Sequence, residues 1–138
     1  MNKKTLNDFR YERRIYHANT DSAGVVYYGN YFIFFEEARA EWLRALGFEQ
    51  RSIVDELQTH ILVKKVSEMN FIKPALMDDL IYIQCKLISN TKVSFTIEQI
   101  AFNENNDILV SAKIDLLCVD AESKRPKRAP EALLNKLS

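Results

Sequence analysis

The clearest periodic pattern in the chain is helical and lies between residues 30 and 47. Apolar residues recur there at i, i+3, i+4 and i+7 spacing, while charged residues occupy much of the opposite side. Asn30 is expected to cap the N-terminus, and Gly47 to end the helix just beyond Leu46. The face expected to be buried comprises Tyr31, Phe34, Phe35, Ala38, Trp42 and Ala45.

Most of the remaining chain alternates between apolar and polar residues, which predicts strands. Short helices are expected at residues 50–57 and 130–137, and the alternation in the second strand breaks near Val66. Because short polar turns join the later strands, we expect successive strands to pair as an antiparallel meander covering the aromatic face of the helix. This is an α+β architecture. The expected strands are residues 9–17, 60–73, 81–87, 93–97 and 108–118.

Composition narrows the classes of protein. The chain has 138 residues, 47% of them hydrophobic, and neither repeats nor linker-like stretches, so residues 1–138 are expected to form a single domain. Nineteen basic and nineteen acidic residues cancel, which removes the bulk electrostatic argument for a nucleic-acid partner. The chain shows no secretory signal and no apolar run long enough for a membrane span, so a cytoplasmic location is expected.

Chemically reactive candidates are few. Cys85 and Cys118 lie on apolar strand faces and are expected to be buried, and no cysteine or histidine cluster suggests a metal site. His17 and His60 are expected to be structural. The informative residue is Asp21, in a turn shortly before the long helix, where its carboxylate could lie near free backbone N–H groups. Such a pairing can support acyl chemistry, but an aspartate before a helix is commonly only a turn former or cap.

Two longer motifs bring in a resemblance. Residues 15–31, IYHANTDSAGVVYYGNY, and residues 34–39, FFEEAR, resemble the signature of hotdog-fold acyl-CoA thioesterases. The branch that matches best is the 4-hydroxybenzoyl-CoA thioesterase family, which includes the bacterial thioesterases associated with the Tol-Pal system. The similarity continues through residues 71–75 and Asp79 and covers nearly the whole chain. It implies the hotdog fold, a five-stranded antiparallel sheet wrapped around one long helix.

The resemblance also implies roles for individual residues. Asp21 would be the catalytic carboxylate, acting as nucleophile or as general base on water, and the backbone N–H groups of Tyr28 and Gly29 would bind the thioester oxygen. The turn between the third and fourth strands would contact the phosphates of coenzyme A. The residues that match this turn are Thr91, Lys92 and Ser94.

The same resemblance sets expectations for substrate and assembly. The substrate would be an acyl-CoA with an aromatic or short acyl group, or an acyl-carrier-protein thioester. No metal or other cofactor would be needed, because coenzyme A enters as part of the substrate. The active sites would lie between protomers of a homo-oligomer, either a dimer or a tetramer.

Two positions depart from the family pattern. Asn19 replaces the first aspartate of the motif, so a structural role is expected for it, and Tyr28 stands where the Tol-Pal branch has histidine. A hotdog hydratase or dehydratase is one rival, but it would need a histidine at the helix start. A protein that only binds CoA thioesters, within an envelope-associated assembly, is another and would not need Asp21. The basic segment 124–128 is expected to be a solvated turn, with a share in phosphate binding as the alternative.

Overall fold

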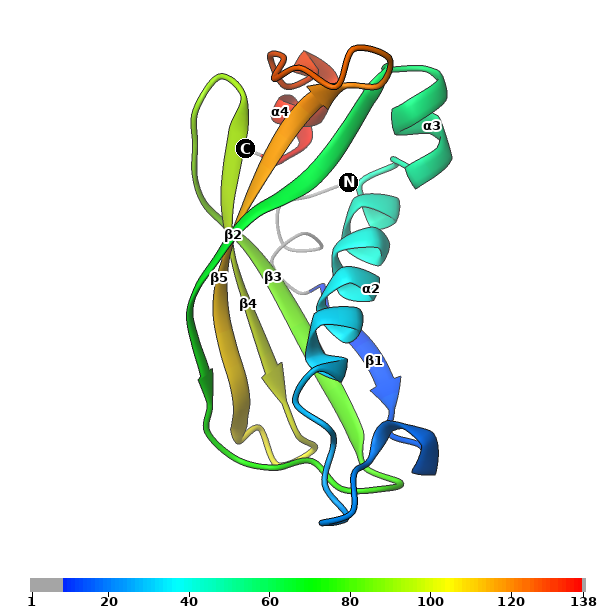
Figure 1. The fold of residues 1–138 in the computed structure, drawn as a ribbon, viewed down its shortest axis with the longest axis vertical. Coiled ribbons are helices and arrows are strands. Elements are labelled where there is room, and N and C mark those ends of the chain that lie inside the picture. Colours follow the sequence, from blue (N-terminus) through cyan, green and yellow to red (C-terminus); the bar gives the residue numbers. More distant parts are fainter. Residues whose placement is uncertain (1–8, 138) are drawn as a thin grey trace.

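The central feature of the fold is one long helix held in the concave face of a curled antiparallel sheet (Figure 1). The computed structural model describes residues 9–137. The elements are the strands β1 (Tyr11–Arg14), β2 (Thr59–Phe71), β3 (Leu80–Asn90), β4 (Ser94–Phe102) and β5 (Ile108–Asp120), the helices α2 (Asn30–Ala45), α3 (Gln50–Asp55) and α4 (Glu131–Leu137), and the 3₁₀ turn η1 (His17–Asn19). The expected five-stranded sheet around one helix is confirmed.

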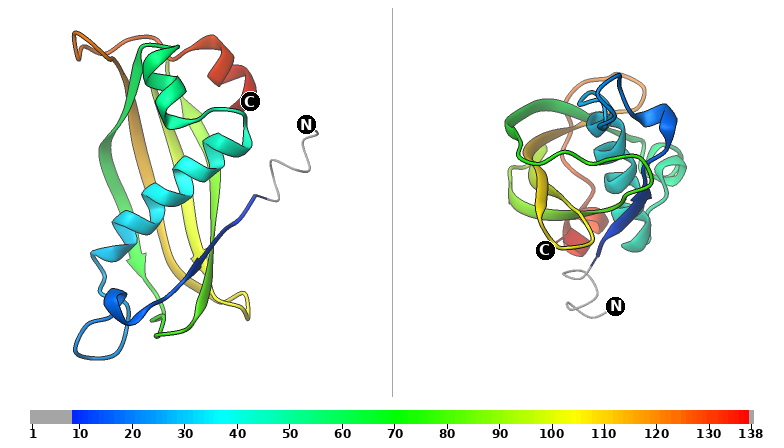
Figure 2. Two further views of the ribbon diagram at one scale, coloured as in Figure 1. Left: turned by 90° about the vertical axis from the view of Figure 1, so that its right-hand side faces the viewer. Right: turned by 90° about the horizontal axis from the view of Figure 1, so that it is seen from below.

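The core forms where the apolar face of α2 meets the sheet. Five of the six residues predicted for that face are buried: Tyr31, Phe34, Phe35, Ala38 and Trp42. Ala45 is exposed, and Leu46 takes its place in the core. Full burial of a large apolar side chain contributes about 1.5–3 kcal/mol, so this face holds the helix on the sheet. Figure 2 shows α2 lying along the length of the sheet, at an oblique angle to the strands.

Both ends of α2 show how local sequence fixes it. Gly47, at φ +98°, ends the helix as predicted; its N–H donates to Arg44, and the N–H of Phe48 donates to Leu43, the pattern of a Schellman motif. At the other end the prediction was wrong by one residue. Gly29 is the N-cap and Asn30 is the first helical residue. The Asn30 side chain does not cap the helix, because its amide donates to the carbonyl of Asn19 at the end of η1.

The meander prediction holds for β3, β4 and β5 but not for β2. The strand order is β1-β3-β4-β5-β2, so β2 pairs with β5 at one edge of the sheet rather than with β3. Residues 72–79 form a crossover instead of a tight turn, held at the end of the sheet by a bridge between Val25 and Leu76. The predicted break in β2 is present as register shifts on both sides of Val66.

Among residues 9–137, none of the helices has the length and apolar character needed to cross a membrane. The same residues contain no group of three or more His, Cys, Asp or Glu side chains placed to hold a metal ion.

Both cysteines are buried, as predicted. Burial raises the pKa of the Cys85 thiol to about 12 and that of the Cys118 thiol to about 11. Because the thiolate is the reactive form, both side chains should remain unreactive thiols well above neutral pH. We therefore expect a disulfide reagent at pH 8 to label neither cysteine in the native protein, and both after unfolding in guanidinium. Rapid labelling of one thiol per native chain would contradict the burial described above.

Candidate active site

Asp21 lies at the start of an exposed loop that precedes α2. The loop is closed by a bridge between Thr20 and Val26, and Asp21 donates its N–H to the carbonyl of Val25 at 2.9 Å. One carboxylate oxygen, Oδ1, accepts the N–H of Ala23 at 2.8 Å, which orients the side chain. The other oxygen, Oδ2, has no partner among residues 9–137. The carboxylate is therefore oriented by the loop and still open to a reactant.

The start of α2 presents unpaired backbone donors. The N–H groups of residues 30–32 are already bonded, since they donate to the carbonyls of Tyr27, Tyr28 and Gly29. Within the part of the chain that the structure describes, no acceptor meets the N–H of Tyr28 or Gly29. Free N–H groups at a helix N-terminus carry positive partial charge and favour an anionic oxygen. This is the donor pair that the resemblance implied.

The pairing of Asn19 with Tyr27 brings the carboxylate and these donors to the same part of the molecule. The Tyr27 N–H donates to the Asn19 carbonyl at 3.0 Å. Asp21 follows Asn19 closely in the sequence, and Tyr28 directly follows Tyr27, so this bond draws both residues together. Gly29 leaves room for the Tyr27 ring, because an added Cβ would stand 2.7 Å from it. A structural role was expected for Asn19, and its side-chain oxygen accepts the Tyr16 N–H at 2.8 Å.

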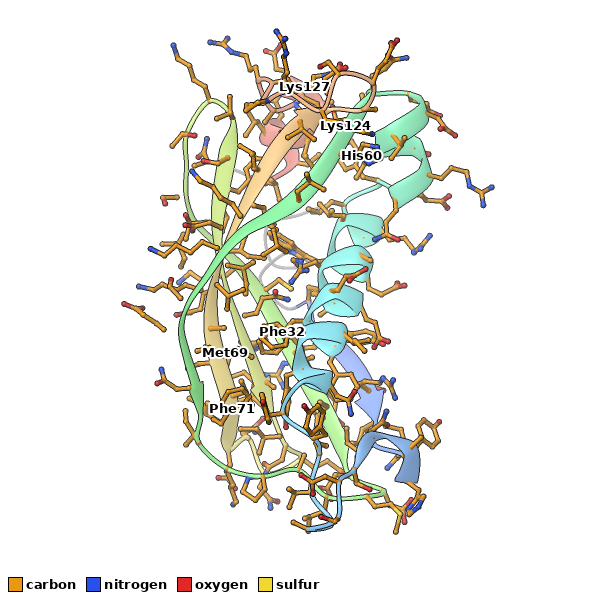
Figure 3. All side chains as sticks on the ribbon, in the orientation of Figure 1. Phe32, His60, Met69, Phe71, Lys124 and Lys127 are labelled. Atoms are coloured by element: carbon orange, nitrogen blue, oxygen red, sulfur yellow. The ribbon has the colours of Figure 1, made fainter. Side chains whose placement is uncertain are left out.

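An apolar cavity of about 250 Å³ opens next to Tyr28. Phe71 at the end of β2 forms one wall, and its ring lies 5.9 Å from that of Tyr28, centroid to centroid (Figure 3). Tyr31, Pro74 and Ala75 also line the cavity. The size and lining of this cavity suit a small apolar group attached to a carbonyl held by the helix N-terminus.

The Tyr31 hydroxyl is the one buried side-chain polar atom within residues 9–137 that has no hydrogen-bond partner. Burial, assisted by the charge of Asp79, raises the pKa of Tyr31 to about 12, so the hydroxyl keeps its proton. The wall of the apolar cavity thus includes a tyrosine whose hydrogen-bonding capacity is unused.

The residues implied for phosphate contact lie at the opposite end of the chain fold. Thr91 and Ser94 share a 2.7 Å hydrogen bond in the β3–β4 turn, far along the sheet from the loop of Asp21 (Figure 1). Lys92 lines a cavity of about 410 Å³ together with Arg128, and its carbonyl accepts the N–H of Ala129 at 2.9 Å. One chain therefore does not bring Lys92 and Asp21 together.

Comparison with known proteins identifies the family. The sequence pattern that defines the Thioesterase superfamily matches residues 23–110, which include the donor pair, α2 and most of the sheet. The chain belongs to the Thioesterase superfamily. The family resemblance of the sequence and the hotdog fold that it implied are both confirmed.

Individual relatives extend this result. The chain is 32% identical over 126 residues to the acyl-CoA thioester hydrolase YbgC of Escherichia coli, covering 91% of this chain and 92% of that one. A hypothetical protein from Aquifex aeolicus superposes with a TM-score of 0.85 at 28% identity, covering 94% and 99% of the two chains. A probable thioesterase from Bartonella henselae gives 0.83 at 31% identity, covering 88% and 98%.

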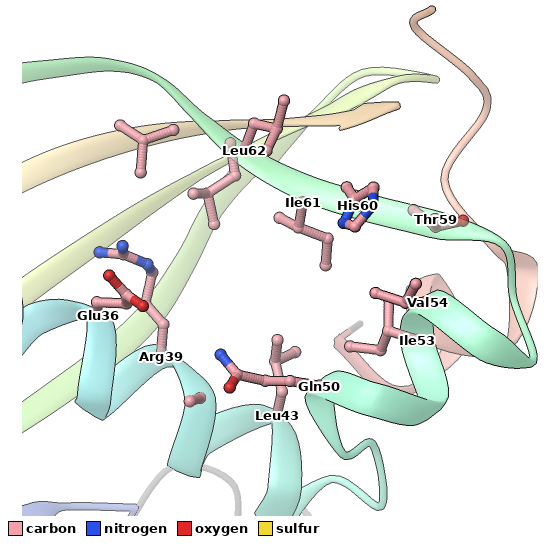
Figure 4. A pocket seen from close by; sticks show the side chains of 13 residues that line it. Glu36, Arg39, Leu43, Gln50, Ile53, Val54, Thr59, His60, Ile61 and Leu62 are labelled. Atoms are coloured by element: carbon pink, nitrogen blue, oxygen red, sulfur yellow. The ribbon is translucent and has the colours of Figure 1, made fainter. Parts of the chain in front are cut away.

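A further cavity, of about 330 Å³, lies between α2, α3 and the start of β2 (Figure 4). Arg39 and Glu36 lie close together at one end and His60 at the other. Arg39 donates to Gln99 at 3.0 Å, and burial lowers its pKa. Because opposite charges lie side by side, the cavity does not select strongly for an anion or a cation.

The sequence pointed to the loop of Asp21 as a candidate site, but it did not reveal several of the residues that lie around the site. Phe71 was recognised only as part of a family motif, although it forms a wall of the cavity beside Tyr28. For the basic segment 124–128 the sequence offers only a share in phosphate binding as an alternative, and it does not show that Arg128 lines the same cavity as Lys92, because the two residues are far apart in sequence. His17 is exposed, so the structural role expected for its side chain has no contact to support it within residues 9–137.

Proposed function

We propose that the protein hydrolyses acyl-CoA thioesters with an aromatic or short acyl group to the free acid and coenzyme A. The observation that carries this proposal is the open carboxylate oxygen of Asp21 in the loop that leads to the unpaired N–H groups of Tyr28 and Gly29. The E. coli relative named as an acyl-CoA thioester hydrolase supports it. An acyl-carrier-protein thioester would present the same reacting group.

The proposed chemistry follows from the charge that develops on the thioester oxygen. The N–H groups of Tyr28 and Gly29 bind this oxygen as the carbonyl carbon becomes tetrahedral, and a single donor of this kind is typically worth about 100- to 1000-fold in rate. Asp21 either attacks the carbon, expelling the thiolate and leaving an anhydride that water then hydrolyses, or removes a proton from the attacking water. In both routes the apolar cavity takes the acyl group, and no metal or cofactor takes part.

At the other end of the fold, Lys92 and Arg128 would bind the phosphates of coenzyme A. Both line the same cavity, and the nearby Thr91 and Ser94 supply hydroxyl groups. Two cations at one site favour a multiply charged anion, and hydrogen bonds that involve a charged partner are about twice as strong as neutral ones.

The distance between these two ends supports a site shared by two protomers. β2 pairs only with β5 within residues 9–137, and its side chains Leu62 and Val63 are each 48% exposed. An edge strand of this kind can pair with the same strand of a second copy. Two-fold antiparallel pairing reverses the partner, which places its Lys92 end beside the Asp21 end of the first chain. A cytoplasmic homo-oligomer, dimer or tetramer, remains part of the proposal.

The role of Asp21 is tested by Asp21→Asn, with Asp55→Asn as a control that makes the same change on an exposed residue of α3. An amide is a much weaker nucleophile and base, so we expect kcat to fall by at least about 100-fold with the fold intact. Thiol release from aromatic, short and long acyl-CoAs is the measurement. Equal turnover by variant and wild type would remove Asp21 from the mechanism. Tight binding without turnover by either would favour the non-catalytic rival.

The contribution of Lys92 is tested by Lys92→Ala, with Lys86→Ala as the matched control on the exposed part of β3. Loss of one charge-assisted contact should raise KM for acyl-CoA about tenfold and leave kcat unchanged. A truncated thioester of N-acetylcysteamine lacks the nucleotide, so its kinetics should not change. Equal losses on both substrates would show that Lys92 does not bind the nucleotide.

The shared site is tested at the exposed edge of β2. A charge on an edge strand opposes edge-to-edge pairing, so Val63→Lys should shift the species seen in sedimentation velocity toward the monomer and lower kcat with it. Ile88→Lys removes a similarly exposed apolar side chain from β3 and is the control. A wild-type protein that sediments as an active monomer would contradict the proposed assembly.

A further inference from the structure

The loop that carries Asp21 is fastened at its base by two asparagines. The carbonyl oxygen of Asn19 accepts two hydrogen bonds, from the Tyr27 N–H at 3.0 Å and from the side-chain amide of Asn30 at 2.8 Å. We propose that Asn30 and Asn19 are positioning residues, which hold the Asp21 carboxylate in register with the N–H groups that follow Tyr27. This inference rests on the proposed function, since it concerns how those groups are held.

The Asn30 side chain does not have the usual role of an asparagine near a helix start. Such a residue normally caps the helix by accepting a backbone N–H. Here it is the first helical residue, and its amide nitrogen instead donates backward to a carbonyl eleven residues earlier in the chain. The two donors on Asn19 use both lone pairs of its carbonyl oxygen. Without Asn30, a single bond would join the two ends of the loop at this point.

A second set of contacts fastens Asn19 to the middle of the same helix. The Asn19 side-chain oxygen accepts the Tyr16 N–H at 2.8 Å and faces Arg13 Nη1 at 3.5 Å. Arg13 in turn bonds to Glu37 at 3.1 Å, and its guanidinium lies 4.7 Å from the centre of the Phe34 ring. Because Glu37 and Phe34 belong to α2, the helix holds the loop both at its own start and one to two turns further along.

This arrangement predicts how loss of the Asn30 donor should change kcat and KM. The reacting carboxylate and the oxyanion donors must keep their relative positions to a fraction of an ångström, and a displacement of about 1 Å can reduce the rate about 100-fold. The groups proposed to bind coenzyme A lie at the other end of each chain, and Asn30 does not line their cavity. Loss of the Asn30 donor should therefore lower kcat and leave KM nearly unchanged.

The test compares Asn30→Asp and Asn30→Ala with wild type. Aspartate is close in shape to asparagine but cannot donate when ionised, and its negative charge is favourable at a helix N-terminus, so the fold should keep its stability. Alanine removes the donor without adding charge. Asn105→Asp, on the exposed β4–β5 turn, carries the same charge change as a control. We expect both Asn30 variants to lose about 10- to 100-fold in kcat, and the control none.

A second measurement does not require turnover. Amide hydrogen exchange, followed by NMR, should be faster at Tyr27 in both Asn30 variants than in wild type, because the bond that closes the loop is then unsupported. Unchanged exchange with unchanged kcat would overturn the proposal. So would a loss confined to Asn30→Asp, which would trace to charge near Asp21 and not to the missing donor. If the wild type hydrolyses no thioester, the proposed function fails, while the exchange rates still decide whether Asn30 positions this loop.

Discussion

The rest of the structure depends on the burial of one helix face by the sheet that curls around it. Tyr31, Phe34 and Phe35 are in the core within two turns of the N-terminus of α2, so that end of the helix cannot move without exposing aromatic surface. Gln99, fully buried on β4, adds a polar tie by donating to the Phe35 carbonyl at 3.0 Å. The backbone N–H pair of Tyr28 and Gly29 is therefore held in place by the packing of the helix that follows it.

The candidate site shows how a short loop can combine side-chain and backbone chemistry. Asp21 is exposed and is held by a single turn, whereas the donors of Tyr28 and Gly29 directly precede a helix that is packed into the core. The two parts are joined by contacts that run from α2 through Arg13 to Asn19. Backbone donors next to a buried helix, together with a tethered carboxylate, suit a reaction in which charge develops on an oxygen at a fixed position.

The elements with strong local periodicity were predictable from the sequence, and those that depend on distant pairing were not. The buried face of α2 and the alternation in β5 follow from residue spacing, which is a local property. The position of β2 beside β5 depends on the path of residues 72–79, which no spacing reveals. The same holds for the candidate site. The family motifs include both Asp21 and Phe71, but they do not place Phe71 in the cavity beside Tyr28, because that position is set by the end of the distant strand β2.

The opposite placement of Asp21 and Lys92 in one chain has a genetic consequence. If each site takes its carboxylate from one protomer and its phosphate contacts from the other, a two-fold dimer holds two sites that draw on both chains. A chain damaged at Asp21 and another damaged at Lys92, each poorly active by itself, would then assemble into a mixed dimer with one site intact and one doubly damaged. Two defective alleles expressed together would therefore complement each other. They would not do so if each site were built from the residues of one chain alone.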